Sequence, residues 1–152
     1  TVQLLAYMQG ELERFGISGR DAAMRVGIAL EEALSNAVIH GNLEIDSALR
    51  ESGAREYEQE IARRRSIEPY RHRRVRFSAR FSPTEAAFEV GDEGQGFDVA
   101  SIPDPTDFAN LTKLSGRGLL LMRTFMDDVR FNSRGNQVLM IKRKELAADA
   151  AI

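Results

Sequence analysis

Three polar side chains on one segment are of types that could do chemistry. In "EEALSNAVIHGN" (31–42), Glu32, Asn36 and His40 follow one another at intervals of four, so on an α-helix they share one face. A carboxylate can accept a proton or orient a water, and an amide oxygen is a hard ligand that suits Mg²⁺ bound to phosphate oxygens. The pair Glu32 and Asn36 could therefore serve one phosphate-bearing site. The alternative is a solvated helix edge, where both residue types are common.

The second feature is the glycine-rich segment "GDEGQGFD" (91–98), which follows an expected strand. Asp92 would stand at the end of that strand, and Gly94 and Gly96 would let a ligand approach the backbone closely. The glycine order differs from that of a dinucleotide-binding fingerprint, and the Gly-Lys-Ser/Thr ending of a P-loop is missing. A glycine-rich turn with an aspartate cap is the structural alternative.

The third feature is "SGRGLLLM" (115–122), where Gly116 and Gly118 stand at the start of an apolar helical pattern. A helix N-terminus with free backbone amides is suited to binding phosphate. Lys113 or Arg117 could add positive charge. The alternative is a junction between loop and helix that needs unusual backbone dihedrals.

The first feature lies on the second of two predicted amphipathic helices. Apolar residues at helical spacing predict the first helix over residues 2–15. After "GISGR", Ser18 or Asp21 could cap a second helix that runs to about His40, where the Gly-Asn pair that follows would end it. Its buried side would consist of Val26, Leu30, Ala33, Leu34, Ala37 and Val38.

The second feature follows the first of two predicted hairpins. The strands 75–81 and 86–92 alternate apolar and polar residues around the turn "SPTE", and the strands 129–133 and 137–144 are joined by "RGN". A helix beginning at "GRGLLLM" precedes the second hairpin. We expect an α+β class: a two-layer sandwich whose mixed, mostly antiparallel sheet is covered on one face by helices, in a single domain over residues 1–152.

Residues 46–74 form a charged segment, which we expect to be a solvated helix that ends near Pro69. Glutamate precedes arginine by four residues in Glu51/Arg55 and Glu60/Arg64, which favours helical ion pairs. Seven arginines fall between positions 63 and 76. The remainder of the chain is acidic and aromatic residues are few in this segment, so a charged helix face is favoured over nucleic-acid binding.

Composition limits the class of protein. The chain has 152 residues, the size of one ordinary domain, and 43% of them are hydrophobic. The net charge of -2 provides no general attraction to nucleic acid or anionic lipid, and no apolar run is long enough for a membrane span. The absence of cysteine excludes disulfides and thiolate metal sites and fits a cytoplasmic location. A start at Thr1, inside a helical pattern, suggests an excised domain.

The three motifs occur in an order that resembles the GHKL ATPase superfamily, which includes gyrase, chaperone, histidine-kinase and mismatch-repair proteins. The likeness is strongest to bacterial anti-sigma-factor serine kinases, whose pattern Glu-Ala-x-x-Asn-Ala-x-x-His-Gly stands here as "EALSNAVIHG" (32–41). "MRTFMDDV" (122–129) is similar to the helix that follows their glycines. The likeness covers residues 18–45 and 75–144 and implies the GHKL (Bergerat) ATP-binding fold.

The resemblance implies a role for each motif residue. Asn36 would coordinate Mg²⁺, Glu32 would be the general base, and Asp92 would accept a hydrogen bond from the adenine amino group. The base would lie against the backbone of Gly94 and Gly96. Residues 97–115 would be the ATP lid. The nucleotide-binding set at the lid and its phosphate-side hinge would be Lys113, Ser115, Gly116, Arg117 and Gly118. His40 and Gly41 would shape the helix end.

The function implied is an ATP- and Mg²⁺-dependent serine/threonine protein kinase in bacterial signalling. Its protein partner would be an antagonist protein or a sigma factor, with a homodimer also compatible. The chain departs from these kinases because it lacks their N-terminal strand, inserts residues 46–72 as in domains linked to response-regulator or phosphatase modules, and has Leu114 where many have arginine. Three alternatives therefore stay open: a sensor histidine kinase domain, a non-catalytic nucleotide-dependent switch, and a protein that binds no nucleotide.

Overall fold

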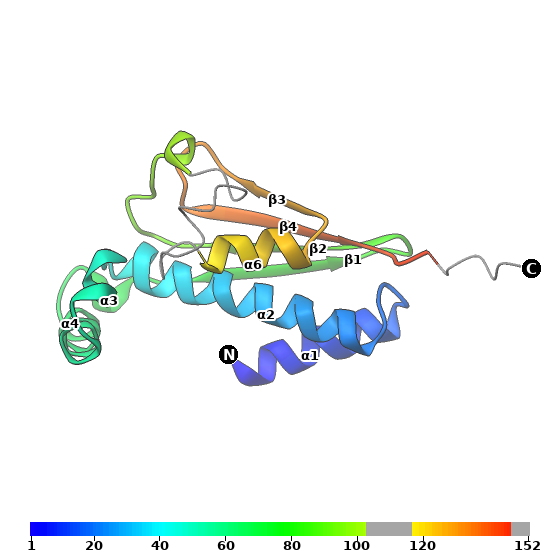
Figure 1. The fold of residues 1–152 in the computed structure, drawn as a ribbon, viewed down its shortest axis with the longest axis horizontal. Coiled ribbons are helices and arrows are strands. Elements are labelled where there is room, and N and C mark those ends of the chain that lie inside the picture. The colour runs from blue at the N-terminus through cyan, green and yellow to red at the C-terminus, as the bar shows by residue number, and fades with distance from the viewer. Residues whose placement is uncertain (103–116, 147–152) are drawn as a thin grey trace, which may run out of the picture.

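The computed structural model describes residues 1–102 and 117–146 (Figure 1). The helical elements are α1 (Val2–Arg14), α2 (Arg20–Asn36), the π-helical turn η1 (Ala37–Asn42), α3 (Ala48–Ser52), α4 (Ala54–Ser66), the 3₁₀ turns η2 (Tyr70–His72) and η3 (Val99–Ser101), and α6 (Arg117–Phe125). The strands are β1 (Arg76–Phe81), β2 (Glu85–Gly91), β3 (Asp128–Phe131) and β4 (Gln137–Arg143). Helices α1 to α4 come first, and two hairpins follow, with η3 and α6 between them.

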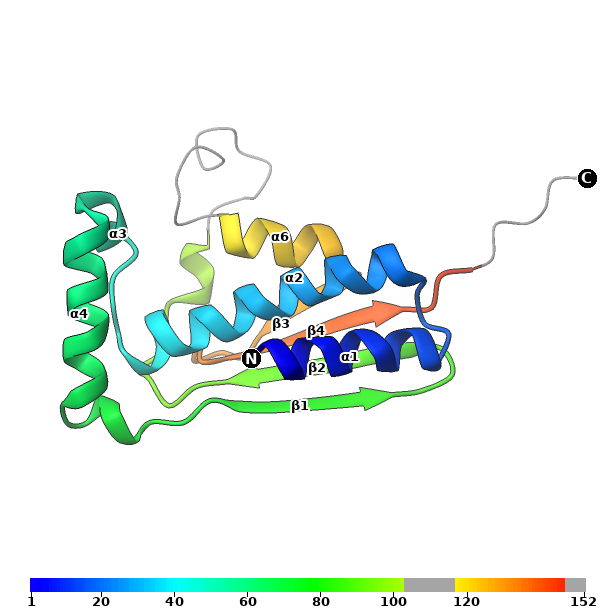
Figure 2. The ribbon, with the colours of Figure 1, turned by 90° about the horizontal axis from the view of Figure 1, so that it is seen from below.

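The sheet has the order β1-β2-β4-β3, and each of these strands is antiparallel to its neighbours. Both predicted hairpins are confirmed. Helices α1, α2 and α6 cover one face of the sheet (Figures 1 and 2). The predicted α+β two-layer sandwich is therefore confirmed, and its described sheet is antiparallel throughout rather than mixed.

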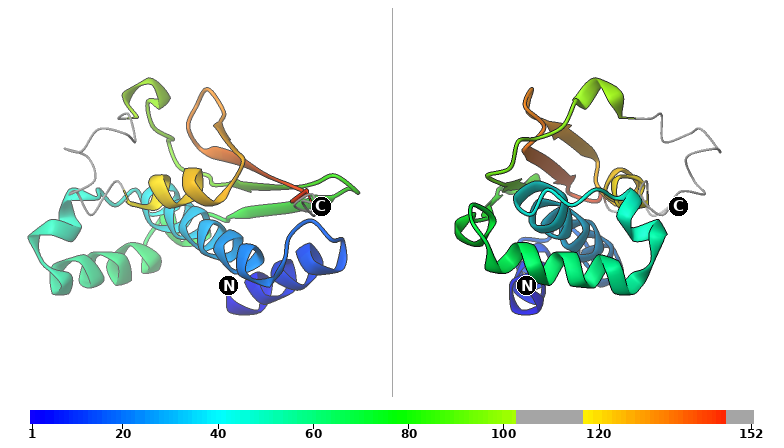
Figure 3. Two further views of the ribbon diagram at one scale, coloured as in Figure 1. Left: turned by 45° about the vertical axis from the view of Figure 1, so that its right-hand side comes forward. Right: turned by 90° about the vertical axis from the view of Figure 1, so that its left-hand side faces the viewer.

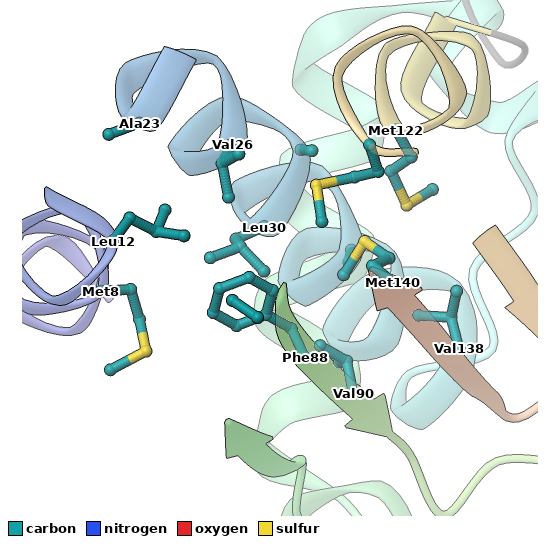
Figure 4. Packing of buried hydrophobic residues seen from close by; sticks show 14 of the residues in the cluster. Met8, Leu12, Ala23, Val26, Leu30, Phe88, Val90, Met122, Val138 and Met140 are labelled. Carbon is teal, nitrogen blue, oxygen red and sulfur yellow. The ribbon is translucent and has the colours of Figure 1, made fainter. Parts of the chain in front are cut away.

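The core lies between the sheet and these helices because every second residue of β2 and β4 points toward them. Phe88 of β2 and Met140 of β4 are opposite each other in the register and completely buried. Leu12 of α1 and Leu30 of α2 pack onto them from the helical layer (Figure 4). Each such side chain contributes about 1.5–3 kcal/mol through burial. This core fixes the end of β2, and therefore Asp92, relative to α2.

The start of α2 differs from the prediction. Gly19 is the N-cap residue, and neither Ser18 nor Asp21 caps the helix. The segment after β4 holds this turn instead: the Glu145 amide donates to the Ile17 carbonyl at 2.9 Å, and the Gly19 amide donates to the Glu145 carboxylate at 3.5 Å. A contact that is distant in sequence thus replaces the expected local cap.

The end of this helix also differs from the prediction. After Asn36 the helix does not stop at Gly41 but continues as the π-helical turn η1, and the left-handed backbone conformation occurs at Glu44 (φ 53°). Gly41 is needed for another reason: a Cβ atom there would lie 2.3 Å from Cγ of Asp92. π-Helical turns inside α-helices are frequent at functional sites.

The charged segment forms two helices rather than one. Gly53 separates α3 from α4, so Glu51 and Arg55 do not share a helix and form no ion pair in the described structure, whereas Glu60 and Arg64 do pair at 2.7 Å. Helix α4 ends at Ser66, before Pro69. Both helices stand at the end of α2–η1 (Figures 2 and 3). No helix within residues 1–102 and 117–146 is long and apolar enough to cross a membrane.

Candidate functional site

A cavity of about 560 Å³ lies between α2–η1, the end of β2 and α6. Four of the predicted site residues line it: Asn36, Asp92, Gly96 and Arg117. Three more are immediate neighbours, because Gly118 lies against Glu32 and Asn36, and Gly94 lies against Gly41. The predicted residues Lys113, Ser115 and Gly116 lie outside the described residues, as does the predicted lid beyond residue 102.

Asp92 is held at the end of β2 by backbone hydrogen bonds. Its amide donates to the Asn136 carbonyl at 2.9 Å, and its Oδ1 accepts from the Gly94 amide at 2.8 Å. The second oxygen, Oδ2, accepts from no donor among residues 1–102 and 117–146. Because Asp92 lines the cavity, its carboxylate can accept a hydrogen bond from a ligand there.

Asp92 is a buried carboxylate rather than a surface one. Asp92 is only 8% exposed. Burial raises the pKa of Asp92, and the Gly94 amide and the charges of Arg73, Arg134 and Arg76 oppose that rise. Asp92 makes no ion pair within the described residues, and a buried unpaired carboxylate is costly to the fold, which makes Asp92 a candidate for a binding or catalytic role.

The glycines beside Asp92 let three backbone segments pack directly on one another. A Cβ atom on Gly94 would lie 2.1 Å from the Gly41 carbonyl oxygen of η1. A Cβ atom on Gly96, whose φ is +78°, would lie 1.9 Å from the Arg134 carbonyl oxygen in the β3–β4 turn. These contacts account for both glycines without a ligand. The prediction that a base lies against them stays a prediction.

Glu32 and Asn36 meet the start of α6 at the other end of the cavity. A Cβ atom on Gly118 would lie 2.7 Å from Oε2 of Glu32 and 3.4 Å from Nδ2 of Asn36. Arg117, the first residue of α6, lines the cavity and is exposed. The amides in the first turn of a helix have no intrahelical acceptors, so they can bind an anion here.

His40 and Asn136 also line the cavity. Nδ1 of His40 lies 2.6 Å from the Ile45 carbonyl oxygen, in keeping with the predicted role of His40 in shaping the helix end. Asn136 had no predicted role, because asparagine is common in turns. It nevertheless binds Asp92: its Nδ2 donates to the Asp92 carbonyl at 3.2 Å, and its Oδ1 accepts from Asn132 at 2.8 Å.

The site thus combines an acceptor at the end of β2 with a carboxylate and an amide near the end of α2, which lie beside the start of α6. No curated protein matches the chain. The family description of the histidine kinase-like ATPase domain, however, matches residues 1–142, which is nearly the whole chain. This match includes every element that lines the cavity, and we conclude that the chain belongs to the histidine kinase-like ATPase domain family, of the GHKL type.

Proposed function

We propose that this domain is an anti-sigma-factor-type serine/threonine protein kinase that uses ATP and Mg²⁺ to phosphorylate an antagonist protein. Family membership implies ATP binding. The observation that carries the step from binding to transfer is the position of Glu32 beside Asn36 and Gly118, at the start of α6. Glu32 precedes Gly41, the neighbour of Asp92, by nine residues of α2 and η1, which is about two helical turns. That separation suits a ligand with a base at one end and phosphates at the other.

The donor set near the phosphate end fits a magnesium ion that is bound largely through the nucleotide. No group of three or more His, Cys, Asp or Glu side chains within residues 1–102 and 117–146 could hold a metal ion alone. Asn36 would supply one amide oxygen, and phosphate oxygens and waters would complete the coordination, as is usual for Mg²⁺. The bound ion would neutralise part of the phosphate charge.

In the proposed reaction, Glu32 acts as the general base. Its carboxylate takes the proton from the hydroxyl of the acceptor serine or threonine as that oxygen forms a bond to the γ-phosphorus. The bond from the γ-phosphorus to the β,γ-bridging oxygen breaks, and ADP leaves with that oxygen. Arg117 and the first amides of α6 would stabilise charge on the phosphates, which is the main source of catalysis in phosphoryl transfer.

The chemical identity of the phosphorylated residue tests this proposal. The domain would be incubated with γ-labelled ATP, Mg²⁺ and candidate antagonist proteins, and the product would be subjected to acid and base. We expect acid-stable phosphoserine or phosphothreonine that forms only when Mg²⁺ is present. Acid-labile phosphohistidine would support a sensor histidine kinase instead. ATP-dependent partner binding without transfer would support a non-catalytic switch.

Gly118→Ala is expected to slow phosphoryl transfer about tenfold while raising the thermal midpoint of unfolding. Alanine is favoured over glycine inside a helix by about 1 kcal/mol. Its methyl group would lie 2.7 Å from Oε2 of Glu32 and would force that carboxylate to move. Turnover at saturating ATP and thermal unfolding are the two measurements.

The matched control is Gly10→Ala in α1, where a Cβ atom would meet nothing within 4 Å. This variant should gain stability in the same way and keep its turnover. Equal turnover in both variants would show that the contact between Gly118 and Glu32 has no part in transfer.

A further inference from the structure

Two arginines from the charged segment bind the end of the helix that carries Glu32 and Asn36. Arg64 of α4 donates through Nη1 to the carbonyl oxygens of Leu43 and Glu44, at 2.6 Å each. Arg73, which follows η2, donates through Nη1 to the Asn42 carbonyl at 2.9 Å and to the Glu44 carboxylate at 2.7 Å. The last carbonyls of a helix have no intrahelical donors, and positive charge there is stabilising. These two arginines therefore cap α2–η1.

The two arginines are held in place rather than free in solvent. Both guanidinium groups lie over the ring of Tyr70, with each guanidinium carbon 5.1 Å from the ring centroid. Glu60 pairs with Arg64 at 2.7 Å. The side chains of Arg64 and Arg73 are 22% and 17% exposed, whereas that of the neighbouring Arg71 is 52% exposed. Most of the segment is a solvated face, as predicted, but this arginine pair is not.

The helix end that the pair caps is in turn bonded to the loop that carries Asp92. Asn42 is 5% exposed, and its side-chain oxygen accepts a hydrogen bond from the Glu93 amide at 2.8 Å. Gly41, the preceding residue, packs against the Asp92 carboxylate. On the other side, the Glu93 carboxylate accepts from the Arg74 amide at 2.9 Å. A continuous set of contacts therefore joins α4 and η2 to Asp92.

We propose that Arg64 and Arg73 are positioning residues for recognition of the nucleotide base, and that they act through Asn42 and Glu93 on Asp92. They fix the end of η1, the Asn42 side chain then fixes the amide after Asp92, and the Asp92 carboxylate thereby keeps its place at the cavity. The charged segment is thus a working part of the nucleotide site. The claim about base recognition rests on the proposed nucleotide role of Asp92, whereas the positioning of the loop does not.

The first test needs no nucleotide. Amide hydrogen exchange, resolved by residue with NMR, would be compared in the wild type, Arg73→Met and the control Arg71→Met, which loses only exposed contacts with Glu68 and His72. Methionine keeps an apolar stem beside Tyr70 but removes the donors. We expect the Glu93 amide to exchange at least about tenfold faster in Arg73→Met, with the sheet amides unchanged. An unchanged Glu93 amide, or equal acceleration in the control, would overturn the proposal.

The second test measures the ratio of the dissociation constants for GTP and ATP. If Arg73 acts through Asp92, Arg73→Met should lower this ratio about tenfold, a change of about 1.4 kcal/mol, while a general loss of stability would weaken both nucleotides equally. Arg73→Lys, which keeps one donor, should recover part of the ratio. Arg64→Met gives an independent variant should Arg73→Met not fold.

The outcomes separate this inference from the proposed function. A wild type that binds neither nucleotide would contradict the proposed function, and the exchange rate at Glu93 would still decide whether the arginines position the loop. A wild type that prefers ATP, with an Arg73→Met variant that keeps the same ratio, would overturn the inference and leave the proposed function standing.

Discussion

Replacing Glu32 with glutamine is expected to slow phosphoryl transfer by at least about 10²-fold and to leave ATP binding within about twofold of the wild type. The two side chains have nearly the same shape, so the amide can occupy the same space against Gly118. It cannot accept the proton of the attacking hydroxyl at neutral pH. Loss of a general base lowers turnover by about 10²–10⁴-fold. Single-turnover transfer to the antagonist and a separate ATP titration would measure the two effects.

Glu31→Gln is the matched control, since Glu31 is the exposed neighbour on the same helix. It makes the same change in net charge and should keep full turnover. If Glu32→Gln transferred phosphate at the wild-type rate, Glu32 would not be the base. If it lost ATP binding as well, Glu32 would contribute to binding rather than to proton transfer.

The layers of this fold could be predicted because their signals are local. Alternation along 75–81 and along 86–92, joined by a short turn, specifies an antiparallel hairpin without knowledge of any other segment. The helical spacing of apolar residues places α1, α2 and α6 on the core in the same way. The three site motifs could be placed relative to one another only through the resemblance to a known family, because residues as distant as Asn36 and Asp92 share no local pattern.

The errors arose where a contact distant in sequence replaces a local preference. The Gly-Asn pair at 41 and 42 looks like a helix stop, yet Gly41 is there to admit the Asp92 carboxylate, and Asn42 bonds Glu93 across a separation of 51 residues. Arg73 caps a helix that ended 31 residues earlier. By sequence alone, Arg64 and Arg73 cannot be told from the exposed arginines around them, since only the folded chain brings Tyr70 and the helix end to them.

Replacing Asp92 with asparagine is expected to weaken ATP binding by at least about 10²-fold without destabilising the fold. A site built around a buried hydrogen-bonding group discriminates strongly once donor and acceptor no longer match. The amide that replaces Oδ2 can present a donor toward the adenine amino group, itself a donor. The contact from the Gly94 amide to Oδ1 can be kept by the new carbonyl oxygen. An ATP titration and thermal unfolding of the same variant would test both parts.

The pH dependence of stability follows from the direction of the pKa shift. Burial raises the pKa of Asp92, so the folded protein holds this proton more tightly than the unfolded chain. The stability that comes from the bound proton is present below the ordinary pKa of aspartate and is lost as pH rises through the raised pKa. At pH 7 the ionised Asp92 therefore costs the wild type stability. Asp92→Asn should then melt at the same temperature or up to about 4 °C higher.

Asp21→Asn is the control, because Asp21 is exposed in the first turn of α2. Asp92 lies near the opposite end of that helix, beside Gly41. Asp21→Asn should bind ATP normally and should not gain stability, since a negative charge near a helix N-terminus is favourable. An Asp92→Asn variant that bound ATP as tightly as this control would contradict the assignment of Asp92 to the base. A lower melting temperature at pH 7 would mean that the carboxylate stabilises the fold. The stability that the carboxylate contributes would then account for its burial without a ligand, and Asp92 would be a structural residue at the end of β2.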